Sequence, residues 1–190
     1  MANLIGARIE RKEDKKFLTG KGRYTADINL PRQTYAHFVR SPHARAKITK
    51  VDISKASKAS GVVKVLTGDD LAKDKIGGLI AGWKIVSQDG KDMKIPPKPP
   101  LVKDSVNFVG DHVAVVIAET LEEAKNAAEL VSVSYKILKA VVNTSDAMNS
   151  EAIHEGIERN LCFDFLLGDK GKTDEAFSKA DKVVKLDLIN

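Results

Sequence analysis

The chain has 190 residues, of which 43% are hydrophobic and 30% are charged, with a formal net charge of +5. This balance predicts one globular domain, or one domain with part of another, and excludes a disordered chain. No apolar run approaches the ~20 residues that a membrane-spanning helix needs, and the charged N-terminus MANLIGARIERKEDKK is unlike a secretory signal. The single cysteine, Cys162, rules out an internal disulfide and favours a cytoplasmic location.

Positive charge is concentrated near the N-terminus. Residues 1–50 hold 12 Lys and Arg against 4 Asp and Glu, whereas residues 51–190 hold 19 against 22. Such an asymmetry is typical of a surface that attracts an acidic partner or a polyanion. Lysine outnumbers arginine 24 to 7, however, and arginine is the residue suited to bidentate phosphate and base contacts. The composition therefore favours a solvated lysine surface over a nucleic-acid site.

The first quarter of the chain predicts an arm followed by two strands. Residues 1–16 form a charged, weakly patterned arm, and residues 17–31 are rich in turn-forming residues. TYAHFVRS at 34–41 and AKITKVDI at 46–53 alternate apolar and polar residues and are rich in β-branched and aromatic types. Both features are typical of strands with one buried face.

The link between these two strands carries three cations close together. Ser41-Pro42-His43 predicts a turn, because proline fixes φ and a serine side chain bonds to nearby backbone. We expect Arg40, Arg45 and Lys47 to lie at the strand ends and to meet acceptors on a neighbouring domain or subunit. The basic first third of the chain would then be a docking face.

The middle of the chain predicts a third strand between two short helices, and then a long irregular excursion. DISKASKASG at 52–61 has a capping residue and a glycine stop around a short helix. VVKVLTG at 62–68 is the strand, and Thr67 with Asp70 predicts a capping box before a helical turn at LAKD. Residues 74–104 lack periodicity and include IPPKPP, which has few backbone donors.

The clearest apolar pattern follows at residues 106–137. It predicts strands at 106–109 and 113–118 joined by a Gly-Asp turn, and then a helix that Thr120 and Glu123 cap. The helix has an alanine-rich face that suits close approach to a sheet; its members are Leu121, Ala124, Ala127, Ala128 and Val131. Alternation resumes at Val131, Val133 and Tyr135, so this region predicts a βαβ-type unit.

The pattern loosens after residue 143. A short helix is expected at Asp174–Ala180 and a strand from about Val183. Because the sequence stops inside or just beyond that strand, we expect a truncated chain.

The histidines and the cysteine show no metal-binding pattern. His37, His43, His112 and His154 lack i, i+4 helical spacing, and Cys162 has no C-x-x-C partner. We expect these side chains to be structural or exposed to solvent.

Two glycine-containing segments are weak candidates for phosphate loops. GKGRYT at 20–25 has two glycines but no third, and no obvious helix follows it. Gly171-Lys172-Thr173 resembles the end of a P-loop, but Leu166 stands where that motif needs its first glycine. Neither segment predicts a nucleotide site.

One carboxylate lies in an apolar run. Asp164, in LCFDFLL, is a candidate functional carboxylate, although a capping or turn role is the simpler interpretation. A G-x-S-x-G nucleophile elbow and a Cys/His pairing motif are both absent. The residues alone therefore predict no catalytic, cofactor-binding or metal-binding site.

A series of turn and cap motifs resembles the start of the molybdopterin-binding large subunit of the xanthine dehydrogenase and aldehyde oxidase family, which includes aerobic carbon monoxide dehydrogenase. These motifs are LTGKGRY at 18–24, RSPHARAKI at 40–48, GVVKV at 61–65 and VGDHVA at 109–114. No single motif is very specific, but their number and order identify the family. Residues 11–137 carry the match nearly throughout, and residues 140–190 match more loosely.

The resemblance implies an α+β fold. After the arm at 1–16, an α/β-hammerhead domain would occupy 17–138. Residues 139–190 would form a connector and, from Gly168, the truncated start of a molybdenum-cofactor-binding domain.

The resemblance also implies an oxidoreductase. Such a large subunit oxidises or hydroxylates aldehydes, N-heterocycles or carbon monoxide with water as the oxygen source. It holds a molybdenum–molybdopterin dinucleotide, and its electrons leave through iron–sulfur and FAD subunits. The family's cofactor loops and catalytic glutamate lie beyond the hammerhead. The resemblance therefore assigns no site residue here and implies that this fragment binds no cofactor and is inactive alone.

Two positions depart from the family pattern, and two other functions stay open. Ser60 replaces the usual proline before Gly61, and Arg32 replaces the usual glycine after Leu-Pro; both changes concern turns only.

The first alternative function is a freestanding, non-catalytic hammerhead module for protein docking. The second is a polyanion binder that uses the basic N-terminal region, against which the 5% aromatic content argues.

Overall fold

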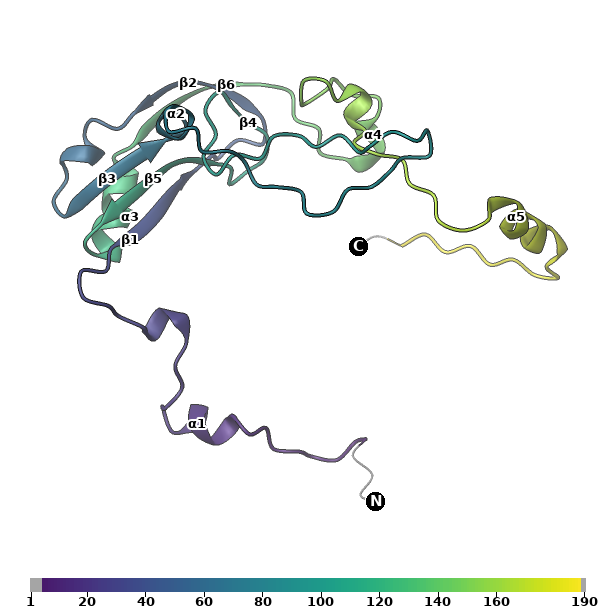
Figure 1. Ribbon diagram of the computed structural model, residues 1–190, viewed down its shortest axis with the longest axis horizontal. Helices are drawn as coiled ribbons and strands as arrows, with labels where there is room; N and C mark the ends of the chain where they lie inside the picture. Colours follow the sequence, from purple (N-terminus) through teal and green to yellow (C-terminus); the bar gives the residue numbers. More distant parts are fainter. Residues whose placement is uncertain (1–4, 189–190) are drawn as a thin grey trace. The chain divides into compact units, whose positions relative to one another are not determined.

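The structure is a computed structural model that describes residues 5–188 (Figure 1). Its helices are α1 Asp14–Leu18, α2 Gly68–Lys73, α3 Leu121–Glu129, α4 Thr144–Ala147 and α5 Lys170–Lys179. Its strands are β1 Tyr35–Arg40, β2 Ala46–Asp52, β3 Val62–Thr67, β4 Ser105–Val106, β5 His112–Ala118 and β6 Ser132–Ile137. Single 3₁₀ turns occur at η1 Thr25–Asp27, η2 Ala56–Lys58 and η3 Glu158–Asn160. Among residues 5–188, no helix combines the length and apolar character needed to cross a membrane.

The chain divides into two compact units, each built from three stretches of sequence. The first unit contains the chain up to Val39, Asp52–Val65 and Val115–Ser132. The second contains Arg40–Val51, Leu66–Ala114 and the chain from Val133 onward. Each unit is therefore assembled from segments that are distant in sequence.

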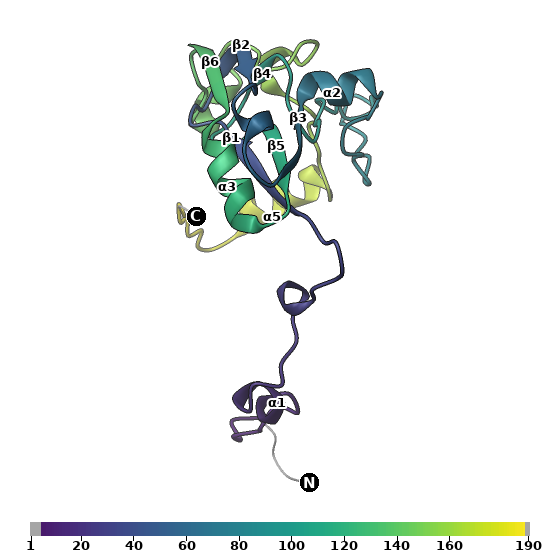
Figure 2. The same cartoon turned by 90° about the vertical axis from the view of Figure 1, so that its left-hand side faces the viewer.

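The first unit centres on the strand order β1-β5-β3, with α3 beside this sheet in Figures 1 and 2. Strand β1 alternates half-buried and exposed residues, as its sequence predicts. Val116 and Ala118 of β5 are fully buried, as is Ala124 of α3. Alanines on the helix allow this close packing, because a small side chain keeps the helix near the sheet.

The predicted capping box of α3 is confirmed. Thr120 Oγ1 accepts a hydrogen bond from the Glu123 N–H at 3.2 Å, and the Thr120 N–H donates to the Glu123 carboxylate at 3.1 Å. Leu121 was expected on the buried face but is 44% exposed. It is the first residue of the helix, and the buried face starts with Ala124 in the next turn.

A glycine is required where β3 meets this cap. Gly61 has φ of +71°, and a Cβ built there would lie 2.1 Å from the Glu123 carboxylate carbon. The Gly61 carbonyl also accepts a hydrogen bond from the Glu119 N–H at 2.9 Å. The positive φ and the close carboxylate both disfavour any other residue.

The second unit contains the strand order β4-β2-β6. Strands β2 and β4 are antiparallel, with Ala46 opposite Val106. Four buried residues of this unit form a hydrophobic cluster, and four partly buried residues pack against it. The buried members are Ala46, Val102, Val106 and Val113, and the partly buried ones are Ile48, Val51, Val133 and Tyr135.

The capping box predicted at Thr67 and Asp70 is also confirmed, and the helix α2 begins at Gly68, three residues before the expected turn at LAKD. The Thr67 N–H and hydroxyl both donate to the Asp70 carboxylate, at 2.8 and 2.9 Å. A Cβ at Gly68 would lie 2.4 Å from the Val102 carbonyl oxygen. The helix can therefore begin against the 102–103 backbone only because residue 68 lacks a side chain.

Several predictions about regular structure are wrong. The strand expected at 106–109 is only Ser105–Val106. It pairs with β2 and not with β5, so the expected hairpin is absent. Strands β5 and β6 likewise lie in different sheets, so the helix between them is not part of a single-sheet βαβ unit. The helix expected at 52–61 is only the single turn η2.

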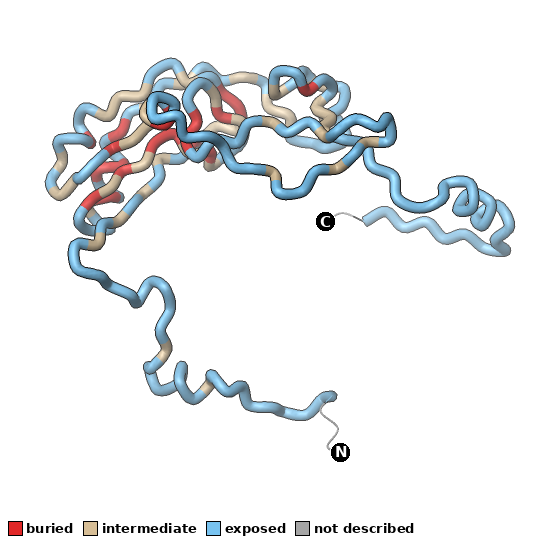
Figure 3. Tube along the Cα trace, viewed as in Figure 1, coloured by how far each residue is buried: buried red, intermediate tan, exposed pale blue. Residues whose placement is uncertain are grey.

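The two ends of the described chain contain no buried residue, as Figure 3 shows for residues 5–34 and 163–188. Arg32, where the resemblance leads us to expect a glycine, has φ of +60°, a conformation that glycine adopts at lower cost. Helix α5 begins at Lys170, four residues before the expected start, and residues 181–188 form no strand. Residues 1–4 of the expected arm and residues 189–190 lie outside the described chain.

Candidate functional site: a polar corner and a tied connector

The predicted turn at Ser41-Pro42-His43 is confirmed. Ser41 is 2% exposed, and its Oγ donates to the His43 carbonyl and accepts from the His43 N–H, both at 3.0 Å. The Ser41 backbone also pairs with the 110–111 segment: its N–H donates to the Asp111 carbonyl at 2.9 Å, and its carbonyl accepts from Gly110 at 2.8 Å. These bonds fix the chain just after it leaves β1.

Ionisable side chains surround this turn. Asp111 is 7% exposed, and its carboxylate accepts from the Asn107 N–H at 3.0 Å. The rings of His43 and Tyr135 meet edge to face, with centroids 4.9 Å apart. Burial of the phenol raises the pKa of Tyr135, the negative charge of Asp111 raises it further, and a hydrogen bond with Ser41 opposes both.

These residues do not form a nucleophile–base pair. A catalytic serine needs its hydroxyl to be hydrogen-bonded to a base. The Ser41 hydroxyl bonds instead to the His43 backbone, and the His43 ring packs on Tyr135. This arrangement, which we call the polar corner, stabilises the chain path and offers no reactive group.

The structure contradicts a docking role for Arg45. This residue is 9% exposed, and its guanidinium donates to the carbonyls of Lys139 and Ala152, both at 3.1 Å. Glu151 lies 3.7 Å away, but its own side chain is 79% exposed, so this ion pair adds little. The sequence shows the charge of Arg45 but not its burial, which depends on residues 94 and 107 positions later.

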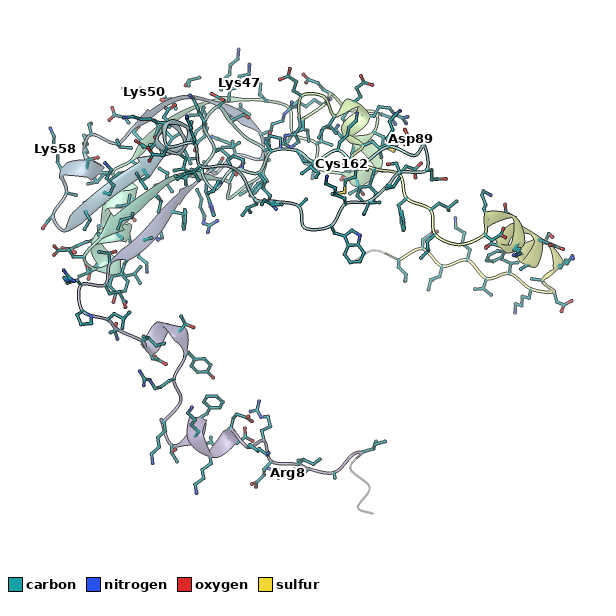
Figure 4. The ribbon with its side chains drawn as sticks, in the orientation of Figure 1. Arg8, Lys47, Lys50, Lys58, Asp89 and Cys162 are labelled. Carbon is teal, nitrogen blue, oxygen red and sulfur yellow. The ribbon has the colours of Figure 1, made fainter. Side chains whose placement is uncertain are left out.

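The two other cations of the predicted docking set remain accessible. Arg40 is exposed, although its guanidinium donates to the Gly110 carbonyl at 3.1 Å. Lys47 is exposed on β2 and is labelled in Figure 4 with Lys50 of the same strand.

The Asn160 side chain hydrogen-bonds to the backbone of the same segment, whose two ends, Lys139 and Ala152, bond to Arg45. Its side-chain nitrogen donates to the carbonyls of Ala147 and Glu151, at 2.9 and 3.2 Å. Its side-chain oxygen accepts from the Ile153 N–H at 2.8 Å. Asn160 and Arg159 both have positive φ, at 54° and 57°. Our sequence reasoning missed Asn160, and its only signal was that asparagine tolerates this backbone region.

The histidines and Cys162 do not converge. His37 is half-buried in β1, and His112 is the first residue of β5. His154 lies in the connector, whereas the carbonyl of Cys162 accepts from the Lys94 N–H at 2.9 Å (Figure 4 labels Cys162). Across residues 5–188, no three His, Cys, Asp or Glu side chains are placed to hold a metal ion.

The backbone of Asp164, and not its carboxylate, has a structural role. Its carbonyl accepts from the Gln88 N–H at 2.9 Å, and its N–H donates to the Ser87 hydroxyl at 3.2 Å. The side chain itself is exposed. Asp164 therefore anchors the irregular 74–104 excursion, and it lies in irregular chain and not in the expected cap or turn.

Neither glycine-containing segment forms a phosphate loop. Gly171-Lys172-Thr173 lies inside α5, and the Lys172 N–H donates to the Asp169 carboxylate at 3.0 Å. This bond and the Lys172 side chain lower the pKa of Asp169. The Asp169 carboxylate thus already accepts from the backbone N–H that a bound phosphate would need. Segment 20–25 precedes only the short turn η1, and a Cβ at Gly22 would meet the Phe17 ring at 2.7 Å.

These elements define an α+β structural domain in which polar side chains hold turns and a connector. Residues 19–139 match the family model described as "Aldehyde oxidase and xanthine dehydrogenase, a/b hammerhead domain". The chain therefore belongs to the aldehyde oxidase and xanthine dehydrogenase family. The resemblance and the hammerhead fold predicted from the sequence are confirmed.

Three relatives show how far the similarity extends. The chain is 36% identical over 182 residues to the nicotine 6-hydroxylase large subunit of Paenarthrobacter nicotinovorans, covering 96% of this chain and 22% of that protein. It is 32% identical to the structure of reconstituted CO dehydrogenase from Oligotropha carboxidovorans, with a TM-score of 0.72 over 93% of this chain and 22% of that one. For quinoline 2-oxidoreductase from Pseudomonas putida 86 the identity is 35% and the TM-score 0.68, over 77% and 18%. The chain spans about a fifth of the length of these relatives.

Proposed function

We propose that this chain is the N-terminal scaffold region of a molybdenum hydroxylase large subunit. The observation that carries this proposal is the match of 96% of the chain to part of one nicotine 6-hydroxylase large subunit. The reaction of the whole protein would be oxidation or hydroxylation of an aldehyde, an N-heterocycle or carbon monoxide, with water as the oxygen source. The relatives' names include nicotine, quinoline and carbon monoxide, so they support a range of substrates and not one.

The described residues offer no group of side chains that would hold the metal of the molybdenum–molybdopterin dinucleotide proposed for the whole protein. Residues 5–188 contain no group of ligating side chains for a metal, and no buried side-chain N or O atom that lacks a partner. We therefore derive no catalytic step from this region. Its contribution would be structural, through the two sheets and the tied connector.

The domain limits belong to the same proposal. We place an arm at 1–16, the hammerhead domain at 17–138, and at 139–190 a connector with the start of a cofactor-binding domain. The family match over 19–139 supports the middle boundaries. Exposed apolar side chains support a partner for the last region; they are Phe163, Phe165, Leu166, Leu167, Phe177, Val183, Val184, Leu186 and Leu188.

The proposed partners are the rest of the large subunit and the iron–sulfur and FAD subunits of the same enzyme. Accessible Arg40 and Lys47 are the cations left for such docking. We also propose a cytoplasmic location, which the single cysteine supports.

A freestanding docking module is the second candidate. The observation that favours it is that the strand-containing parts bury a core of their own, with fully buried Val106, Val113 and Val116. Such a module would bind another protein without any redox chemistry.

Analysis of the complete gene product distinguishes the two candidates. The protein would be purified from its native source or by expression of the whole coding region, and its molybdenum content and co-purifying polypeptides would be measured. Stoichiometric molybdenum, with iron–sulfur and flavin absorption in the same complex, supports the enzyme. A protein without molybdenum and without redox-active partners overturns that proposal and favours the module.

A further inference from the structure

The connector at residues 139–160 contains little regular structure to hold it in place. It includes only α4 and the single turn η3, and Ile157 is its one buried residue in the described chain. A segment with so few backbone ladders and so little buried apolar surface is expected to fluctuate. Its order must come from other contacts.

Arg45 supplies the first of these contacts. Its two terminal nitrogens donate to the carbonyls of Lys139 and Ala152, so one side chain joins the start of the connector to a point near its middle. The guanidinium is planar and directs several N–H groups at fixed angles, which suits two carbonyls at once. Because the Arg45 side chain is only 10% exposed, water competes little for these bonds.

Asn160 supplies the second set. Its amide bonds to Ala147 and Glu151, which lie inside the 139–152 loop that Arg45 closes, and to Ile153, the residue just after it. The donor and acceptor atoms of this amide are thereby matched, and the turn η3 places it there through two successive residues with positive φ. The two side chains together hold the connector at five backbone positions.

We propose that Arg45 and Asn160 are positioning residues that hold residues 139–160 in one path. The polypeptide that follows Asn160 within the second unit, where the carbonyls of Cys162 and Asp164 accept from the Lys94 and Gln88 N–H groups, then starts at a fixed point and in a fixed direction. This inference does not depend on the proposed oxidoreductase function, since it concerns only contacts within the second unit. It replaces the surface docking role expected for Arg45 with an internal one.

Amide hydrogen exchange of the complete protein tests the arginine. In Arg45→Lys, an ammonium group cannot reach both carbonyls, so amides between 140 and 153 should exchange roughly tenfold faster. The Leu138 N–H bonds to the backbone carbonyl of residue 45 and should change little, which provides an internal control. Arg40→Lys is the matched control, because Arg40 is exposed and reaches a single carbonyl; exchange at 140–153 should not change.

Asn160→Gly tests the second residue without adding backbone strain. Glycine accepts positive φ, so this variant removes only the side-chain bonds. The Ile153 N–H loses its acceptor and should exchange roughly tenfold faster. This variant also keeps the inference testable if Arg45→Lys fails to fold.

Chemical rescue separates positioning from general stabilisation. In Arg45→Ala, added guanidinium chloride far below denaturing concentrations should restore protection at 140–153, whereas sodium chloride of equal concentration should not. Rescue together with the two local increases supports the proposal. It is overturned if folded Arg45→Lys and Asn160→Gly both leave exchange at 140–153 unchanged, or if the increase is spread evenly over the whole protein.

Discussion

Helices α3 and α5 have similar lengths and similar N-terminal caps but opposite burial. Thr120 and Glu123 cap α3, and the Asp169 carboxylate caps α5. Helix α3 buries Ala124, Ala127 and Ala128, whereas α5 buries none of its residues. A cap thus determines where a helix begins, but packing supplies most of its stability. Helix α3 contributes to the buried core, whereas Phe177 of α5 is 61% exposed.

Replacing an alanine of each helix with the larger leucine should give the largest difference in stability between the two helices. Ala127 is 1% exposed, so Ala127→Leu should lower the free energy of unfolding by about 1–3 kcal/mol. Ala176→Leu on exposed α5 is the matched control and should stay within about 0.5 kcal/mol. Urea unfolding midpoints of the two variants measure this, and equal midpoints would show that α5 is buried in the protein.

Replacing a glycine with alanine should destabilise the region next to α3 and stabilise α5. These effects on the free energy should be smaller than that of Ala127→Leu. Gly61→Ala forces a side chain into a left-handed position against the Glu123 carboxylate and should cost about 1–2 kcal/mol. Gly171→Ala inside α5 meets only ordinary contacts and should favour the helix by about 0.5–1 kcal/mol. Thermal unfolding reports the first change, and amide exchange within α5 reports the second. A neutral Gly61→Ala would contradict the close approach.

Removing the caps should sharpen the distinction between global and local stability. Thr120→Ala should lower the free energy of unfolding by about 1 kcal/mol, because α3 unfolds with the core. Asp169→Ala should only speed amide exchange over residues 170–173 and leave the unfolding midpoint unchanged, because α5 opens by itself. A lowered midpoint in Asp169→Ala would place α5 in the same cooperative unit as α3.

The smallest expected effect concerns pH. Burial raises the pKa of Tyr135 above its ordinary value of 10.0, so the folded state favours the neutral phenol. That contribution to stability is complete below the pKa of the unfolded chain and is lost as the pH rises through the higher folded value. Thermal midpoints from pH 8 to 11 should fall less steeply in Tyr135→Phe than in the unchanged protein. Parallel slopes would show that Tyr135 does not titrate with unfolding.

Local chemistry made several elements predictable. The capping boxes at Thr67 and Thr120 were identified because both partners lie within three residues of each other. The turn at Ser41 followed from proline and serine chemistry in the same way. Strand pairing was not predictable, because periodicity identifies a strand but not its neighbour. For this reason the predictions of a hairpin and of a βαβ unit were wrong, although the positions of β5, α3 and β6 in the sequence were predicted correctly.

The contacts of Arg45 and Asn160 could likewise not be predicted from the sequence. Arg45 is one of seven arginines, and nothing near it in the sequence marks it as buried. Its acceptors at Lys139 and Ala152 are backbone carbonyls, which every residue has, so no side-chain pattern records the contact. Asn160 similarly bonds to backbone at three positions.

The order of turn motifs in the sequence carried the resemblance to the family, and that resemblance implied the α+β class. The sequence alone also determined the caps at Thr67 and Thr120, because a capping residue and its partner are near neighbours in the chain. Only the tertiary structure decided which strands share a sheet, that Arg45 is internal, and that residues 139–160 are tied in place. Those features depend on contacts between residues far apart in the chain, which form only when backbone carbonyls and side chains meet in space.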